Sequence, residues 1–344
     1  MRKQTVIISF IIIMFFFIFG CSKDEKAGKD LAQKKESEAP GRTELSNTYP
    51  LTGEKTNQVV DNRAIAVMIN NHPKARPQTG LSQADLVFEI LAEGNITRLM
   101  ALFQSEQPEE VGPVRSARPY YFNTADDYGA LYVYHGAADF IEAMLVGGAA
   151  DYLNGAHYDN DGYLFKRANF RVAPHNSYLQ FDSVYEVAEE KGYDITADHE
   201  ALLFLEEEEI SNVGGTTATE VSFKYNTTPL RYVYNKETEQ YQRYNGQSQT
   251  VELNTEQSIQ LDNVFILETN HEIVDDAGRR EIDLASGGNA YLLQKGTVQK
   301  IQWENRDGRI IPVREGEPIG LVPGKTWINV IPKNPGLDGV TIIE

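Results

Sequence analysis

Cysteine is almost absent from this sequence. Its 344 residues include a single one, Cys21, so no disulfide can form within the chain. The scarcity of cysteine is compatible with export. If Cys21 is itself modified, no thiol is left to act as a nucleophile.

Positive charge is also in short supply. The chain has 32 Lys and Arg residues against 50 Asp and Glu residues, which gives a formal net charge of −18. A protein of that charge would approach a nucleic acid against its own electrostatic field. We therefore expect no nucleic-acid partner.

The sequence lacks an apolar run long enough to span a bilayer. An apolar run extends from Val6 to Phe19, after Arg2 and Lys3, and polar residues follow from Ser22. A transmembrane helix needs about 20 apolar residues. Basic residues, a short apolar run and a cleavage position are instead the order of a secretory signal peptide.

The end of this run resembles the lipobox that the lipoprotein signal peptidase cuts. It reads Ile18-Phe19-Gly20-Cys21, and Phe19 is bulkier than the residue usual at its position. We predict a signal peptide at residues 1–20, cleavage before Cys21, and a diacylglyceryl group on its thiol. Membrane lipid would then hold the chain on the extracytoplasmic face of the cell membrane. The alternative is a lone cysteine that ends an apolar anchor.

Three further segments follow the signal. Residues 21–46 contain hardly any large apolar side chain, so we interpret them as a flexible tether that begins at the lipidated Cys21. Strands and helices alternate in residues 47–213, which predicts an α/β domain with a mixed sheet. Short alternating segments in residues 214–344 predict a mostly antiparallel β domain. The predicted fold class is α+β.

The strongest element predictions come from apolar periodicity. In the first domain we expect strands at 63–70, 85–93, 96–104 and 131–135, and helices at 120–128, after 139 and at 183–191. Ser116 is the expected cap of the first helix. In the second domain we expect strands at 221–225, 231–234, 241–244, 263–268, 290–293, 298–303 and 327–331.

One predicted hairpin has chemical content. Gly94 suits the first central position of a type II′ turn, which places Glu93 opposite Ile96. In that register Glu89, Glu93 and Arg98 share one face of the ribbon. The opposite, core-facing side is expected to carry Phe88, Ile90, Leu99 and Ala101.

Familiar catalytic motifs are missing. The sequence has no His-x-x-x-His, His-Glu-x-x-His or Gly-x-Ser-x-Gly spacing. Gly324-Lys325-Thr326 resembles the end of a phosphate-binding loop, but Ile319 stands where that motif needs glycine. We therefore predict no metal and no cofactor. The alternative is a zinc hydrolase whose ligands come from distant parts of the chain.

Four segments resemble the YerB-like lipoprotein family. They are residues 68–77, 80–85, 113–119 and 173–176, and the match extends to residues 323–328. The resemblance covers nearly all of the chain after the signal. It implies a lipoprotein signal, an amino-terminal α/β domain and a carboxyl-terminal β-rich domain. Related second domains tend to carry Pro-His after a turn glycine, whereas Gln247 and Ser248 follow Gly246 here. The candidate site is therefore placed in the first domain.

Polar residues at strand ends and adjoining loops form this candidate site, because ligands of α/β proteins bind at such positions. The expected ligand-binding residues are Asn70, His72, Arg76, Arg98, Arg115, Arg118 and Asn176. Arg115 and Arg118 could grip a carboxylate or phosphate by paired hydrogen bonds. The alternative is that the arginines pair with Glu89, Glu93 and Asp139 and hold the domain together.

Three functions are compatible with these residues. The first is binding of a cell-envelope component, either peptidoglycan or a partner protein. The second is a hydrolase or lyase that acts on peptidoglycan with Glu89 or Glu93 and His135 or His175 as acid and base. The third is a structural adaptor without a ligand. Five tyrosines near the arginines would belong to a binding surface or else to the core: Tyr120, Tyr121, Tyr128, Tyr132 and Tyr134.

Overall fold

The structure is a computed structural model that describes residues 45–344. The predicted signal peptide, the lipidation of Cys21 and almost all of the tether at residues 21–46 lie outside the described residues. Among residues 45–344, no helix is both long enough and apolar enough to cross a membrane.

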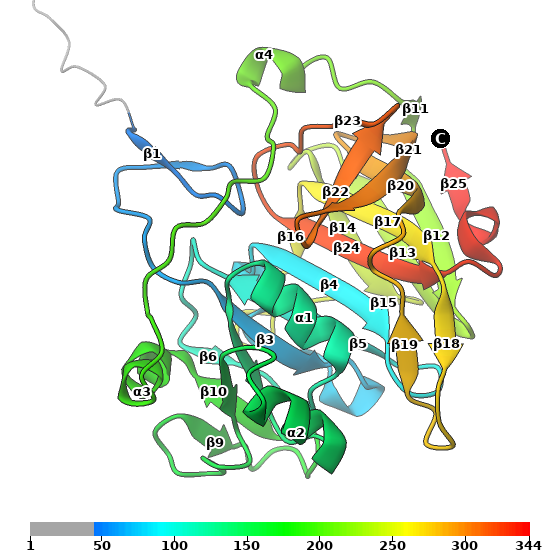
Figure 1. Ribbon diagram of the computed structural model, residues 1–344. Coiled ribbons are helices and arrows are strands. Elements are labelled where there is room, and N and C mark those ends of the chain that lie inside the picture. Colours follow the sequence, from blue (N-terminus) through cyan, green and yellow to red (C-terminus); the bar gives the residue numbers. More distant parts are fainter. Residues whose placement is uncertain (1–44) are drawn as a thin grey trace, which may run out of the picture. The chain divides into compact units, whose positions relative to one another are not determined.

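A long mixed sheet forms the centre of the fold (Figure 1). Its amino-terminal part contains β3 (Ile65–Asn70), β4 (Leu86–Leu91), β5 (Thr97–Phe103), β7 (Leu131–Tyr134) and β8 (Tyr152–Asn154). β5 is antiparallel to β3 and β4, whereas β7 is parallel to β3 and β8. Every residue of β3, β4 and β5 is buried. Burial on both faces explains why these strands have nearly continuous apolar sequences.

The carboxyl-terminal part of the chain completes the same sheet. It supplies β17 (Asn263–Thr269), β20 (Gly288–Gln294), β21 (Thr297–Arg306), β22 (Arg309–Arg314), β23 (Glu317–Pro318) and β24 (Thr326–Pro332), with β11 (Thr216–Thr217) beside β21. The order is β23-β22-β21-β20-β17-β24-β4-β5-β3-β7-β8 in a sheet of 12 strands. β24 lies between β17 and β4 and is parallel to both. A single sheet therefore includes strands from residues 47–213 and from residues 214–344.

Two helices cover one face of the amino-terminal part of this sheet, namely α1 (Pro119–Asp127) and α2 (Asp139–Val146) (Figure 1). Tyr121 and Phe122 of α1 and Ile141 of α2 are buried in one apolar cluster with Phe88 and Ile90 of β4. This cluster also contains the five tyrosines that the sequence analysis named near the arginines. The N-cap of α1 is Arg118, whose side chain makes no capping hydrogen bond, so the prediction of Ser116 as the cap is wrong.

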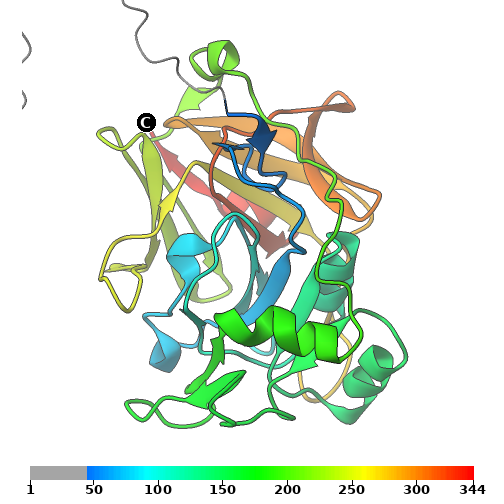
Figure 2. The same ribbon diagram turned by 90° about the vertical axis from the view of Figure 1, so that its left-hand side faces the viewer.

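A second sheet covers the other face near β4, β24 and β17. Its strands are β12 (Glu220–Tyr225), β13 (Thr228–Asn235), β14 (Gln240–Asn245), β15 (Ser248–Gln249), β16 (Gln260–Leu261) and β25 (Thr341–Ile343). Figure 2 shows the central sheet between α1 and α2 on one side and this second sheet on the other. Tyr225, Tyr232 and Tyr241 of the second sheet are buried against Leu91 and Trp327 of the central sheet.

Shorter elements complete the described chain. They are β1 (Asn47–Thr48), β2 (Lys55–Thr56), β6 (Glu110–Val111), β9 (Phe165–Arg167), β10 (Ser177–Gln180), β18 (His271–Ile273), β19 (Arg280–Ile282), α3 (Val184–Glu190), α4 (Glu207–Ile210) and four short 3-10 turns. β6, β10 and β9 form a small sheet. The α+β class is thus correct for the described chain, in which strands predominate and helices are few and short.

The register predicted for the β4–β5 hairpin is wrong by one residue. Glu89 pairs with Leu99, and Ile90 pairs with Arg98. The amide of Ala92 donates to the carbonyl of Ile96 at 2.9 Å, so three residues rather than two form the loop. Because side chains alternate between faces, a shift of one residue moves a side chain to the opposite face. Glu89 and Arg98 therefore lie on opposite faces, and Leu99 and Ala101 lie on the face that carries Glu89.

Candidate functional site

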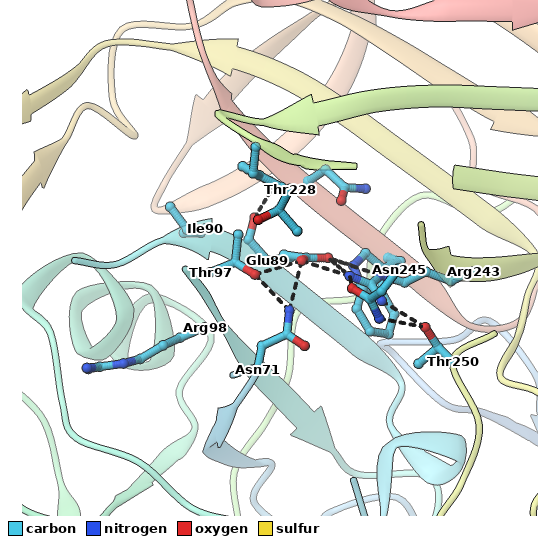
Figure 3. Close-up of polar contacts among 12 residues, drawn as sticks. Asn71, Glu89, Ile90, Thr97, Arg98, Thr228, Arg243, Asn245 and Thr250 are labelled. Atoms are coloured by element: carbon cyan, nitrogen blue, oxygen red, sulfur yellow. Dashed lines mark hydrogen bonds and ion pairs between the residues drawn. The ribbon is translucent and has the colours of Figure 1, made fainter. Parts of the chain in front are cut away.

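The carboxylate of Glu89 lies at the centre of a buried polar cluster between the two sheets (Figure 3). Only 1% of Glu89 is exposed. Asn71 and Thr97 donate to its Oε1 at 3.1 and 2.8 Å, and the indole N–H of Trp327 donates to its Oε2 at 3.0 Å. The phenol of Tyr225 donates to its backbone carbonyl at 2.7 Å. These donors come from four different strands or loops.

Arg243 supplies the charge that balances Glu89. Its Nη2 contacts Oε1 and Oε2 at 2.8 and 2.9 Å, and its Nε contacts Oε2 at 3.1 Å. The guanidinium also donates to Thr250 and lies 4.8 Å from the ring centre of Trp327. Only 1% of each side chain of the pair is exposed. Figure 3 shows Arg98 pointing away from this cluster.

Arg243 and Trp327 are polar partners that sequence reasoning missed. Both come from residues 214–344, where no site was expected. Both residues are far from Glu89 in the sequence, so no local sequence pattern could predict the contact. The one available signal is the charge of Arg243 inside an alternating strand, at a position whose neighbours Tyr241 and Asn245 point to the same face.

A second ionic cluster lies on the other face of β4 and β5. Arg98 donates to Glu93 at 3.0 Å and to the carbonyl of Ser116 at 2.7 Å. Nε of Arg118 donates to Glu93 at 2.6 Å. Burial acts to raise the pKa of Glu93, but Arg98 and Arg118 outweigh it and lower that pKa. Both arginines are buried, so this cluster connects β4, β5 and the start of α1.

The pairing alternative is thus realised for Arg118, which pairs with Glu93, and not for Arg115 among the described residues. Glu93 pairs with Arg98 and Arg118, whereas Glu89 pairs with Arg243. Within residues 45–344, Asp139 forms no ion pair with any of the predicted arginines. Arg76 instead donates to the side chain and carbonyl of Asn71, at 3.0 and 2.7 Å. Arg98, Arg118 and Arg243 therefore pair with carboxylates, and Arg76 is held by hydrogen bonds to Asn71.

The remaining candidates gather at the ends of β3 and β7. The amide nitrogen of Asn70 and Nδ1 of His175 are 2.9 Å apart. The rings of His72 and His175 are stacked, with centres 4.7 Å apart. Nδ1 of His135 lies 2.8 Å from the hydroxyl of Ser177. We call Asn70, His72, Arg115, His135 and His175 the histidine–arginine patch.

Asn176 lies beside this patch. Its side-chain oxygen accepts a hydrogen bond from Arg167 at 2.8 Å, and Arg167 also approaches His135 at 3.4 Å. Arg167 forms an ion pair with Asp159 at 2.7 Å. Asn176 therefore contacts Arg167, which lies between it and His135 and which the sequence did not single out.

Arg115 differs from the other predicted arginines. Its backbone amide donates to Met68 and its carbonyl accepts from His135, which fixes the residue between β3 and β7. Its side chain is half-buried, and within residues 45–344 the guanidinium has no hydrogen bond or ion pair to the protein. Burial lowers the pKa of Arg115, and the positive charge of Arg118 lowers it further.

The electrostatics of the patch favour an anion. Burial lowers the pKa of His72, His135 and His175, and the charge of Arg115 contributes to each decrease. The imidazoles are therefore neutral near pH 7 and offer hydrogen bonds, while Arg115 carries the positive charge. The arrangement can hold a carboxylate or phosphate by charge-assisted hydrogen bonds.

The structure does not assemble the acid–base pairs that were considered. Among the described residues, neither Glu89 nor Glu93 has a hydrogen bond or ion pair to a histidine. Each carboxylate is held by arginine instead. The five tyrosines are at most 6% exposed, so they belong to the core and not to a binding surface. Residues 45–344 contain no group of three or more His, Cys, Asp or Glu side chains that could hold a metal ion.

A small cavity lies near His72. It has a volume of about 230 Å³, and its lining includes Asn71, His72, Arg76, Thr97 and Tyr225. The buried cluster around Glu89 forms its inner end. The cavity adds concave surface next to the histidine–arginine patch.

Comparisons with known proteins agree with this architecture. Residues 51–194 match the family described as "Protein of unknown function (DUF3048) N-terminal domain", and residues 219–328 match the corresponding C-terminal domain. A Bacillus subtilis (strain 168) protein described as "Putative lipoprotein YerB" is 41% identical over 332 residues, which are 96% of each chain. A crystal structure of the YerB protein from Bacillus subtilis is similar with a TM-score of 0.80 and 43% identity. It covers 87% of this chain and 100% of that chain.

Proposed function

This chain belongs to the DUF3048 family, and on that premise we propose that it is a lipid-anchored protein of the cell envelope that binds an anionic group of peptidoglycan. The proposed binding surface is the histidine–arginine patch. The relative from Bacillus subtilis carries the description of a lipoprotein, which supports the anchor proposed at Cys21. Residues 21–46 would give the folded part its reach from the membrane.

The single observation that carries this proposal is the guanidinium of Arg115. A half-buried charge has lost part of its hydration, and proteins ordinarily compensate that loss with a partner. Arg98, Arg118, Arg167 and Arg243 each have one. Arg115 has no such partner among the described residues, and three neutral imidazoles lie close enough for its charge to lower their pKa. A ligand carboxylate would supply the partner, and stem peptides of peptidoglycan carry carboxylates.

The binding role is favoured over catalysis by the state of the two glutamates. An acid or base must be free to reach the reacting group. Glu89 is enclosed by Arg243 and its other donors, and Glu93 is held between two arginines. Neither carboxylate therefore supports a peptidoglycan hydrolase in this conformation.

The test is co-sedimentation of residues 45–344 with purified peptidoglycan sacculi. We expect the protein to pellet, and the Arg115→Met variant to lose at least about tenfold in affinity, because a charge-assisted pair contributes about 1.5–3 kcal/mol. Arg231→Met is the matched control, since Arg231 is partly exposed and pairs with Glu220 on the second sheet. The melting temperature of Arg115→Met should stay close to that of the parent.

Three other results would count against the proposal. Equal pelleting of the Arg115→Met variant would exclude the patch as the binding surface. Failure of the parent protein to pellet would exclude peptidoglycan and favour a partner protein or an adaptor role. Release of soluble fragments from the sacculi would require a catalytic role instead.

A further inference from the structure

A second cavity lies far along the central sheet from the histidine–arginine patch and shares no residue with it. Its volume is about 250 Å³, and it is enclosed by the end of α1, the loop at residues 200–203 and the hairpin formed by β21 and β22. Its walls are mainly apolar and include Leu86, Leu202, Phe265, Ile310, Leu321 and Ile328. Small-molecule sites typically measure about 300–1,000 Å³, so this cavity suits a short ligand.

Arg309 is the unusual residue in this cavity. It begins β22, lines the cavity and is 9% exposed. Its Nη1 is inaccessible and has no hydrogen-bond partner within residues 45–344. Among the same residues the guanidinium forms no ion pair, and its carbon lies 4.8 Å from the ring centre of Tyr128. A guanidinium is always charged at physiological pH, so burial without a partner is costly.

Tyr128 supplies a second donor at the same place. The residue is 1% exposed, and its hydroxyl has no hydrogen-bond partner within the described part of the chain. Burial raises the pKa of Tyr128 far above its ordinary value. The phenol therefore stays protonated and can donate. Buried hydroxyls of tyrosine usually find a partner, which makes the coincidence with Arg309 informative.

Among the described residues, the acidic side chains nearby form no ion pair with Arg309, although Asp127 lies close enough for the charge of Arg309 to lower its pKa. Asp127 packs against Gly308 at the tip of the hairpin, and Glu200 and Asp307 line the cavity. In the described structure none of them forms an ion pair with Arg309. Arg306, at the same cavity, pairs with Glu304 instead. The cavity thus combines apolar walls with one buried positive charge that has no ion pair within residues 45–344.

We propose that this cavity binds a small amphiphile whose anionic head contacts Arg309 and Tyr128. A carboxylate or a phosphate monoester would accept hydrogen bonds from the guanidinium and from the phenol. A short apolar chain would lie along Leu86, Phe265 and Ile328 and be removed from water. The site is independent of the peptidoglycan-binding role, since the two share no residue.

The test measures binding of three probes to residues 45–344 by titration calorimetry. Octanoate and octyl phosphate carry the same chain with different anionic heads, and octanol carries it without a charge. We expect one or both anionic probes to bind at least about tenfold more tightly than octanol, because charged hydrogen bonds to a buried donor are strong. Their relative affinities would tell carboxylate from phosphate recognition.

Variants assign the affinity to named residues. Arg309→Met keeps the length of the side chain and removes the charge, and it should weaken the preferred anionic probe by roughly tenfold or more. Tyr128→Phe should weaken it by a smaller factor. Arg231→Met is the matched control, since this arginine pairs with Glu220 on the second sheet and does not line the cavity, and it should leave the affinity unchanged. Equal affinity for octanol and the anions, no binding of any probe, or equal losses in Arg231→Met and Arg309→Met would overturn the proposal.

The melting temperature of the ligand-free protein provides a separate check. If Arg309 is retained for a ligand, replacing its buried charge by methionine should raise the melting temperature. A marked decrease would mean that the guanidinium stabilises the fold through Asp127 or another group, which would contradict the assignment. Octanoate should raise the melting temperature of the parent and not that of Arg309→Met.

Discussion

The Glu89 carboxylate and the Arg243 guanidinium are buried charges that depend on each other. Moving either ion out of water costs several kcal/mol, and the cost is recovered only with good geometry and further hydrogen bonds. Here Asn71, Thr97 and Trp327 complete the coordination of the carboxylate. The pair also joins β4 of the central sheet to β14 of the second sheet. The pair therefore forms a buried ionic contact between the two sheets.

Removal of one member of this pair should be severely destabilising. We expect Glu89→Gln to lower the free energy of unfolding by about 3–5 kcal/mol, because Arg243 would remain buried without a counter-charge. The double variant Glu89→Gln/Arg243→Met should lose less than the sum of the two single losses. Urea denaturation of the parent, the two single variants and the double variant measures these free energies of unfolding. The control Glu220→Gln breaks a partly exposed pair with Arg231 and should cost less than about 1 kcal/mol. Additive losses at Glu89 and Arg243 would contradict this interpretation.

Asp85 provides a prediction about pH. Burial raises its pKa from 3.8 to about 6, although Ser105 and Gln104 donate hydrogen bonds to its carboxylate. The folded state therefore binds the proton more tightly than the unfolded state. The stability that protonated Asp85 contributes is fully present below about pH 4 and is lost as the pH rises through 6. Two pKa units correspond to about 3 kcal/mol.

Asp85→Asn should remove this dependence. The amide oxygen can accept from both backbone N–H groups, and the amide nitrogen can donate to the hydroxyl of Ser105. Relative to the parent, the variant should gain on the order of 3 kcal/mol between pH 4 and pH 7. Urea denaturation at several pH values measures the difference. A difference that does not change with pH would show that the Asp85 carboxyl has no raised pKa.

At the scale of single residues, the sequence predicted which polar residues form clusters better than it predicted which partners they contact. Glu93, Arg98 and Arg118 were singled out, and they do form a cluster. Glu89 was expected in the same cluster but lies on the opposite face. Its partner Arg243 could not be predicted, because the contact depends on how two sheets stack and not on spacing along a strand.

At the scale of elements, the β4–β5 hairpin shows where sequence patterns lose information. The strands were predicted well, since long apolar runs indicate buried strands. The register was not, because both faces are buried and neither face is marked by polar residues. The loop type alone then sets the register. Gly94, with a φ of +62°, fits a three-residue loop as well as a two-residue turn.

Two hairpin glycines should respond differently to alanine. Gly94 and Gly308 both have positive φ, at +62° and +85°. A Cβ on Gly94 would meet no atom within 4 Å, so Gly94→Ala should cost only the backbone term of about 1–2 kcal/mol. A Cβ on Gly308 would lie 2.3 Å from Cγ of Asp127, so Gly308→Ala should cost more. Thermal or urea unfolding of the two variants tests the order. Equal losses would mean that Asp127 moves aside freely.

At the scale of the whole molecule, β24 determines the architecture. It lies between β17 and β4, so the central sheet is continuous across the chain. The sequence predicts most of these strands but not their order, because the pairing of β24 with β4 joins residues from distant parts of the sequence. The prediction of a second domain that is mostly antiparallel did not foresee the parallel pairs of β24.

The two halves should therefore depend on each other for folding. We expect residues 45–213 and residues 214–344, produced separately, to lack cooperative unfolding transitions. In the first fragment the β4 edge and Glu89 would lose β24 and Arg243. Mixing or co-expression should restore one transition. Circular dichroism and calorimetry measure this, and the intact 45–344 protein is the reference. A sharp transition in either isolated fragment would show that it is an independent domain.

The position of β24 also has a kinetic consequence. Leu86 of β4 pairs with Thr326 of β24, which lies 240 residues later in the chain. Such a high contact order slows folding, since a very long loop must close before the pairing is rewarded. During synthesis the ribosome must have made nearly the entire chain before the central sheet can close. Late closure of the sheet would keep the chain compatible with the export proposed above, while its unpaired strand edge would stay open to aggregation.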